Sequence, residues 1–382
     1  MSVRWAATGA VASVGVALGG LGLGIARRLT APVGGRRYDL TIRGLDESGE
    51  RVIVALDRTP QTAAPGRYSL LLENGRWVRL SSEVEDLGPG LVGRGVLGEP
   101  RAGLHIGERA SWSGIYFSSP EDAGLQASDV AIPTDAGPAP AWLIRPRTGS
   151  STTWAIHIHG LGSARAGTLR GVQVAAETGL TSLVVTYRND GEGPTTGSGR
   201  STLGTTEADD GRAAVLFALA NGASRVILFG WSMGAAIALQ LAADPRLRGI
   251  VAGLVLESPV LDWVSTIKSN CVRSGLPAWT GGLAVPWLDS RQLSRITGLG
   301  APVGLRHFDW ITRADELAAP TLILHGSADT SASIGVAERL RDRRPDLIQL
   351  ERFDADHTMT WNSDAERWRA TVVTMLDDHI ER

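Results

Sequence analysis

The stretch that most constrains this chain runs from Ile227 to Leu239 and reads ILFGWSMGAAIAL. It begins in a short apolar run, passes through a glycine-bracketed serine, Ser232, and continues into an alanine-rich segment of helical composition. Gly230 and Gly234, two positions before and after the serine, let the flanking segments approach each other without a clash. The pattern therefore predicts a strand, a sharp turn and a helix.

Ser232 is the candidate nucleophile. A serine in such a turn is held in strained backbone geometry at the N-terminus of the following helix. Unpaired N–H groups and the helix dipole at that end favour negative charge, which an acyl-transfer intermediate develops on its oxygen. The alternative interpretation is a glycine-rich turn in which Ser232 merely caps the helix.

A histidine and a carboxylate with suitable positions follow Ser232 in the chain. A serine hydroxyl is a poor nucleophile at neutral pH, so it needs a histidine base and a carboxylate that fixes the imidazole tautomer. Asp329 follows the apolar run TLILHG, and His357 follows the next and last run of strand composition. Because ligands of open α/β sheets gather at the carboxyl ends of strands, this order favours a catalytic triad. Glu257 and Asp262, which follow an earlier strand, are rival acids.

Strand-like and helix-like segments alternate along the C-terminal two thirds of the chain. A hairpin is expected within 129–146, and each later apolar run is followed by a helical pattern. The alternation predicts an α/β fold with a doubly wound, mostly parallel sheet. Besides the helix after Ser232, the expected helices lie near 164–178, 206–221 and 333–343 and in the terminal segment to Ile380.

Four motifs, HIHGLGS, GWSMG, LHGSAD and DADHT, resemble the α/β-hydrolase superfamily in their order and spacing. The resemblance covers about 129 to the C-terminus, and the segments YRNDGEGP, LGTTEADD and HTMTWN look like a bacterial branch related to serine aminopeptidase-like and prolyl-oligopeptidase-like hydrolases. It implies nucleophile Ser232, acid Asp329 and base His357.

The resemblance also implies an oxyanion hole built from the backbone N–H groups of Leu161 and Met233. The residues themselves support Leu161, because 159–162 end a strand in a glycine-rich turn whose amides can point inward. A plain strand-to-helix turn is the alternative. His159 is interpreted as a structural turn histidine, as are His157 and His325.

The chain divides into three expected parts. Residues 1–30 form a membrane anchor or signal segment, 31–125 a small β-rich accessory domain, and 126–382 the catalytic domain. Short alternating runs and the turn at Glu73–Arg76 indicate hairpins in the accessory domain, which carries no catalytic constellation. Within the catalytic domain the tryptophan-containing segment 262–315 is either a cap over the strand ends or a long irregular connection.

The N-terminal segment suggests a membrane anchor. Trp5 to Ala26 carries no charge and is bounded by Arg4, Arg27 and Arg28. As a helix it is long enough to cross a hydrocarbon core of about 30 Å, so we expect an N-terminal transmembrane helix. The arginines that follow favour a cytoplasmic catalytic domain. A cleaved signal peptide and a mobile tail are the alternatives.

Composition excludes several function classes. Lys and Arg total 38 against 40 for Asp and Glu, so no excess of basic charge indicates nucleic-acid binding. The single cysteine, Cys271, excludes an internal disulfide. The sequence holds no Cys/His cluster, HExxH motif or EF-hand loop, so neither a metal nor a cofactor is expected.

These patterns together predict a membrane-tethered serine hydrolase that cleaves an ester, thioester or amide through an acyl-enzyme intermediate. The expected substrate is a small-molecule or lipid-like acyl compound, or a short peptide. An esterase is favoured over a peptidase, because the β-rich stretch is too short for the propeller of prolyl-oligopeptidase relatives. A serine peptidase, an acyltransferase and a catalytically silent ligand-binding protein of the same fold are the alternatives.

Overall fold

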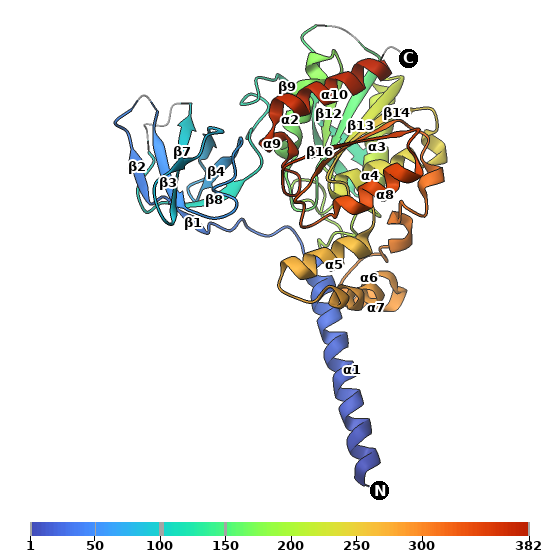
Figure 1. Cartoon of the computed structure of the whole chain (residues 1–382). Coiled ribbons are helices and arrows are strands. Elements are labelled where there is room, and N and C mark those ends of the chain that lie inside the picture. Colours follow the sequence, from blue (N-terminus) through green and yellow to red (C-terminus); the bar gives the residue numbers. More distant parts are fainter. Residues whose placement is uncertain (1, 50, 99–102, 149–150, 381–382) are drawn as a thin grey trace.

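The computed structural model describes residues 2–49, 51–98, 103–148 and 151–380. Figure 1 shows a long N-terminal helix, a small β-rich unit and a larger unit in which helices flank a sheet. Each unit contains one eight-stranded sheet. The predicted α/β fold preceded by a β-rich region is therefore confirmed.

The β-rich unit is an antiparallel sheet with the strand order β1-β8-β4-β5-β7-β3-β2, and β6 pairs with β7. Its own apolar core includes Ile42, Leu56 and Leu80. The hairpin predicted at 73–76 joins β4 to β5. The strands are β1 (Leu40–Thr41), β2 (Gly44–Asp46), β3 (Ile53–Asp57), β4 (Ser69–Leu72), β5 (Trp77–Leu80), β6 (Glu85–Asp86), β7 (Leu91–Leu97) and β8 (Arg109–Ser113).

Arg94 on β7 is a fully buried cation inside this unit. Burial lowers its pKa to about 10, and the guanidinium lies over the rings of Tyr68 and Trp112. Its N–H groups donate to the carbonyl oxygens of Thr62, Ala64, Gly66 and Ser81. Arg94 thereby holds the 62–66 loop in place by hydrogen bonds, and Gly66 of this loop lies against Asn362 of the larger unit.

The larger unit contains a mostly parallel sheet with the order β16-β15-β14-β13-β11-β12-β10-β9. The β9–β10 hairpin is antiparallel and the other six strands run parallel. Every residue of β11, β12 and β15 is buried, as expected for a sheet covered on both faces. The strands are β9 (Ala127–Thr134), β10 (Gly137–Ile144), β11 (Thr153–Ile158), β12 (Thr181–Val185), β13 (Arg225–Trp231), β14 (Val251–Glu257), β15 (Thr321–Gly326) and β16 (Ile348–Phe353).

Helices cover both faces of this sheet (Figure 1). One face packs against α2 (Leu169–Glu177) and α10 (Ala365–Ile380). The other packs against α3 (Glu207–Ala220), α4 (Met233–Ala242) and α8 (Ile334–Arg343). The helices expected near 164–178, 206–221 and 333–343 are therefore confirmed, the first beginning as a 3-10 turn at Arg165–Thr168.

The tryptophan-containing segment 262–315 folds into short helices. Trp263 and Trp310 are buried in the core of the larger unit, whereas Trp279 is exposed. The helices are α5 (Trp263–Arg273), α6 (Val285–Asp289) and α7 (Arg291–Thr297), with 3-10 helices η3 (Ala278–Ala284), η4 (Leu305–Phe308) and η5 (Ala314–Glu316). Figure 1 shows α5, α6 and α7 grouped where the N-terminal helix meets the larger unit.

The predicted transmembrane helix, and with it the predicted membrane anchoring, is wrong, and the cytoplasmic side inferred from that anchor loses its basis. Within the described ranges no helix combines the length and the apolar character needed to span a bilayer. The N-terminal helix α1 (Ser2–Leu29) lacks charges over most of its length but is rich in glycine and alanine, which carry little apolar surface. Absence of charge alone is therefore a poor guide to a membrane span.

The last turns of α1 pack onto the protein instead. Ala26 lies fully buried in the core of the larger unit. Gly22 approaches η3 so closely that a Cβ there would lie 2.2 Å from the carbonyl oxygen of Leu283. Arg27, one of the expected flanking charges, donates to the carbonyl oxygen of Ile296 at 2.8 Å.

Candidate active site

Ser232 occupies the sharp turn between β13 and α4 with φ 53° and ψ −112°. A positive φ is uncommon for a residue with a side chain. A Cβ at Gly230 would lie 2.5 Å from Ala235 Cα, and one at Gly234 would lie 2.1 Å from the carbonyl oxygen of Ile158. Both glycines are therefore required by the close approach of α4 to the strands.

His357 joins Ser232 to Asp329. Its Nε2 lies 2.9 Å from Ser232 Oγ, and its Nδ1 lies 2.8 Å from Asp329 Oδ2. Asp329 follows β15 and His357 follows β16, and these neighbouring parallel strands end at the same edge of the sheet as β13. The structure thus brings together the three side chains that the sequence singled out.

Asp329 is held in an ordered, solvent-free setting, with a side chain that is 0% exposed. Its Oδ1 accepts from the N–H groups of Ser331 and Ala332 at 2.9 and 2.8 Å. Burial opposes a charged carboxylate, but hydrogen bonds from His325 and His357 outweigh it and hold the pKa of Asp329 well below its usual range. An ionised carboxylate therefore faces the imidazole.

The two rival acids are engaged elsewhere. Glu257 is buried, accepts from Trp231 Nε1 at 2.8 Å and from the N–H of Thr360 at 3.0 Å, and pairs with Arg170 at 3.1 Å. Asp262 caps the N-terminus of α5. In the described part of the chain, neither carboxylate contacts the imidazole.

The two predicted oxyanion donors lie near Ser232. Met233 is the first residue of α4, and Leu161 lines the same cavity as Ser232. Over the described residues, neither backbone N–H has a hydrogen-bond partner. Gly160 packs directly on the turn, since a Cβ there would lie 3.2 Å from Ser232 Cβ. Two unpaired backbone N–H groups near Ser232 are compatible with the predicted oxyanion hole.

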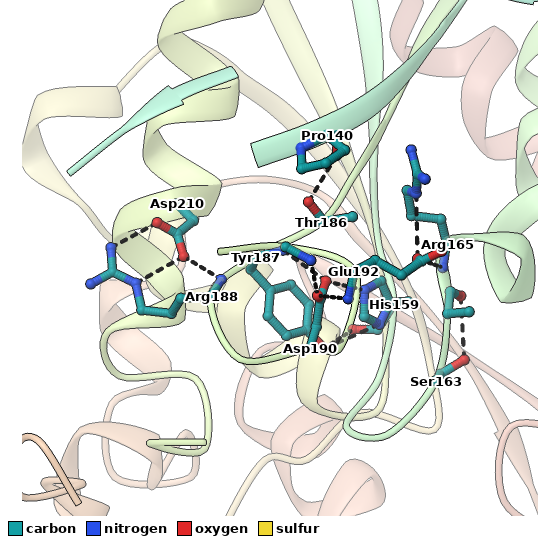
Figure 2. A network of polar contacts seen from close by, with 12 residues as sticks. Pro140, His159, Ser163, Arg165, Thr186, Tyr187, Arg188, Asp190, Glu192 and Asp210 are labelled. Atoms are coloured by element: carbon teal, nitrogen blue, oxygen red, sulfur yellow. Dashed lines mark hydrogen bonds and ion pairs between the residues drawn. The ribbon is translucent and has the colours of Figure 1, made fainter. Parts of the chain in front are cut away.

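A buried polar network lies behind the Gly160–Leu161 turn, and Figure 2 shows its members. His159 Nε2 lies 3.0 Å from Asp190 Oδ2, and the imidazole stacks on Tyr187 with ring centroids 4.5 Å apart. The Tyr187 hydroxyl donates to the carbonyl oxygen of Gly160 at 3.1 Å. Burial is the largest effect on the Asp190 carboxyl and opposes its charge, but the hydrogen bond from His159 helps to lower its pKa.

The structural interpretation of His159 therefore agrees with its contacts, but its partners Tyr187 and Asp190 were missed. The available signal was the segment YRND at 187–190, which directly follows β12. Asp210 on α3 binds Arg188 of the same segment, with Nη2 2.7 Å from Oδ1 (Figure 2).

The comparisons with known proteins agree with this architecture. A family model described as "Alpha/beta hydrolase family" matches residues 149–377, more than half of the chain. The chain belongs to the α/β-hydrolase family. A second model, described as a domain of unknown function, matches 41–113 in the β-rich unit. A search of the curated proteins finds no match for the chain.

Solved structures similar to this α/β-hydrolase include esterases. An esterase of Pyrococcus furiosus is 19% identical with a TM-score of 0.54, over 69% of this chain and 96% of that one. The protein Est1E of Butyrivibrio proteoclasticus, solved with ferulic acid bound, is 19% identical with a TM-score of 0.51, over 66% of this chain and all of that one. At this identity the likeness shows the fold alone.

A cavity of about 160 Å³ opens beside Ser232 and His357 in this α/β-hydrolase. Over the described residues, the 262–315 segment contributes nothing to its lining, so a gating cap gains no support there. Two of the lining residues, Gly114 and Ile115, come instead from the chain that leaves the β-rich unit after β8.

A second serine–histidine pair of the hydrolase lies inside the sheet. His157 Nε2 on β11 lies 3.1 Å from Ser182 Oγ on β12, and both residues are 0% exposed. Burial lowers the pKa of His157 to about 3. Since no substrate reaches this position, the pair is part of the core.

Proposed function

We propose that this α/β-hydrolase is a serine esterase in which Ser232 is the nucleophile, His357 the general base and Asp329 the acid that orients the base. The observation that carries the proposal is the continuous chain of hydrogen bonds, 2.9 Å from Ser232 to His357 and 2.8 Å from His357 to Asp329. These contacts are within the reach required for proton transfer.

In the proposed reaction His357 Nε2 takes the proton of the Ser232 hydroxyl as Oγ attacks the ester carbonyl carbon. The N–H groups of Leu161 and Met233 stabilise the negative charge on the carbonyl oxygen. His357 then gives its proton to the departing alcohol, which leaves an acyl group on Ser232. A water molecule activated by His357 hydrolyses this acyl-enzyme and restores the serine.

Two observations favour ester cleavage within this class. One similar structure is named as an esterase, and another was solved with ferulic acid, a small carboxylic acid. The cavity of about 160 Å³ is suited to a small acyl group rather than to a folded polypeptide. A small uncharged ester is therefore the substrate class that we propose.

The direct test is labelling of the purified full chain with a fluorophosphonate probe, followed by mass spectrometry and p-nitrophenyl acetate hydrolysis. We expect labelling at Ser232 and its loss in Ser232→Ala and His357→Ala, with a fall in kcat of about 10⁶-fold for the serine variant. Ser182→Ala is the matched control and should keep both probe labelling at Ser232 and p-nitrophenyl acetate hydrolysis. A folded wild-type protein that is neither labelled nor active would overturn the proposal.

A further inference from the structure

The wall of the active-site cavity includes the segment that connects the β-rich unit to the hydrolase unit. Ser232, Leu161 and Trp231 belong to the hydrolase unit, whereas Gly114 and Ile115 follow the last strand of the β-rich unit. A Cβ built at Gly167 would lie 3.5 Å from Ile115 Cγ1, so the isoleucine side chain packs against the turn before α2. The segment that directly follows β8 therefore borders the cavity beside Ser232.

Asn362 fixes the Gly114–Ile115 segment in place. The side chain of this residue, 1% exposed, donates to the carbonyl oxygens of Gly114 at 2.9 Å and Arg67 at 2.6 Å. Its Oδ1 accepts from Arg170 Nη1 at 3.1 Å. One buried amide thus ties two loops of the β-rich unit to the hydrolase unit.

The aromatic residues after Ile115 anchor the segment further. The carbonyl oxygen of Tyr116 accepts from Trp77 Nε1 at 3.3 Å, within the β-rich unit. The rings of Tyr116 and Phe117 pack on Trp361 of the hydrolase unit, with centroids 5.4 and 5.9 Å apart. Ile115 is therefore presented on a segment held from both sides, and a fixed wall can discriminate between substrates by size.

In the proposed mechanism the acyl group and the leaving group of an ester occupy different parts of this cavity. In the proposed mechanism His357 protonates the leaving group, which therefore lies toward the imidazole. In the same proposal the acyl group occupies the part of the cavity that Ile115 and the turn at Leu161 line. Ile115 packs against Gly167, which follows that turn in the chain.

The size and chemistry of the cavity limit the acyl group. An apolar cavity of about 150 Å³ holds one benzene molecule, so a cavity of about 160 Å³ accommodates an acyl group of about six heavy atoms. Ile115, Leu161, Trp231 and Met359 line it with apolar side chains, and the charge of Arg170 is matched by Glu257. A short, uncharged acyl group fits this lining.

We infer that Ile115, on the segment that connects the β-rich unit to the hydrolase unit, limits acyl-chain length, so that this connecting segment restricts the enzyme to short-chain esters. The inference rests on the proposed esterase function. It assigns the segment that follows β8 a role in substrate selection.

A p-nitrophenyl ester series from acetate to decanoate tests the inference on the full-length protein. We expect wild-type kcat/KM to peak at or below six carbons. In Ile115→Ala the ratio of kcat/KM for the octanoate to kcat/KM for the acetate should rise about tenfold or more. One methylene group that fits or does not fit an apolar pocket changes kcat/KM by about that factor. Ile115→Phe should shift the preference toward acetate.

The matched control is Ile106→Ala, which truncates an exposed isoleucine of the β-rich unit. It should leave the dependence of kcat/KM on acyl-chain length unchanged. If Ile115→Ala does not fold, Ile115→Val removes one methyl group and should shift the profile in the same direction. An unchanged profile in active Ile115 variants would overturn the inference and leave the esterase function standing. If neither the wild type nor any variant hydrolyses the esters or is labelled at Ser232, both the inference and the esterase function are overturned.

Discussion

The Tyr187 hydroxyl donates a hydrogen bond to the carbonyl oxygen of Gly160 at 3.1 Å. The peptide bond between Gly160 and Leu161 is trans, so its N–H points away from its carbonyl oxygen. A bond that holds the carbonyl on the Tyr187 side therefore directs the Leu161 N–H to the opposite side, where Leu161 lines the cavity with Ser232. Tyr187 is in this way a positioning residue for the proposed oxyanion hole.

Tyr187→Phe should lower kcat for p-nitrophenyl acetate about fivefold with little change in KM, because one neutral hydrogen bond contributes about 1 kcal/mol. Fluorophosphonate labelling of Ser232 should slow by a similar factor. Tyr38→Phe, in the chain before β1, serves as the control. Equal loss of kcat and thermal stability without a change in labelling rate would indicate a purely structural tyrosine.

Asp329→Asn should lower kcat about 10⁴-fold, because an amide no longer fixes the imidazole tautomer that accepts the Ser232 proton. The matched variant is Glu257→Gln, which changes the rival carboxylate that binds Trp231 and Arg170. It should retain activity within about tenfold, since Glu257 does not reach His357. Steady-state kinetics of the two variants decide between the acids, and the reverse ranking would assign the role to Glu257.

His157 should make the protein less stable as the pH falls. Its pKa of about 3 in the folded state lies below the value of about 6.5 expected when unfolded. The unfolded chain therefore binds a proton that the folded protein does not. The associated stability is present above about pH 6.5 and is lost toward pH 3, with a slope of up to about 1.4 kcal/mol per pH unit.

Urea unfolding of wild type and His157→Gln at pH 7, 6 and 5 measures this dependence. The variant should show a shallower fall in the free energy of unfolding across that range. His105→Gln, at an exposed position, is the control and should follow the wild type. If the free energy of unfolding falls equally with pH in the wild type and in His157→Gln, the prediction is contradicted.

Arg94→Met should destabilise the protein by about 3 kcal/mol or more, because it leaves several buried carbonyl oxygens of the β-rich unit without a donor. Urea unfolding measures the loss. Since Arg94 Nη2 donates to Gly66 and Gly66 packs against Asn362, esterase activity should also fall. Arg51→Met, on an exposed arginine at the surface of the same unit, should cost under 1 kcal/mol.

Local patterns were sufficient to predict the hydrolase fold and the three side chains that meet at its sheet edge. The Ser232 turn is encoded by adjacent glycines, and parallel strands deliver Asp329 and His357 to one edge whatever the lengths of the connections. The sequence favoured Asp329 over Glu257 because Asp329 follows the strand TLILHG, whereas the contacts that engage Glu257 elsewhere join residues distant in sequence.

The features that were missed depend on contacts between distant parts of the chain. Nothing near Tyr187 in sequence indicates that its hydroxyl reaches Gly160, and Ile115 lies in a region without catalytic motifs. For α1 the error came from weighing the absence of charge above the small apolar surface of glycine and alanine. Its packing against η3, which depends on Gly22, has no local signature.

That packing has a practical consequence for work with this protein. Because Ala26 belongs to the core of the hydrolase unit, a recombinant protein that starts after Thr30 would expose apolar surface on η3 and α6. Poor yield or aggregation of such a truncation would report a missing piece of the folded domain and would carry no information about the chemistry at Ser232.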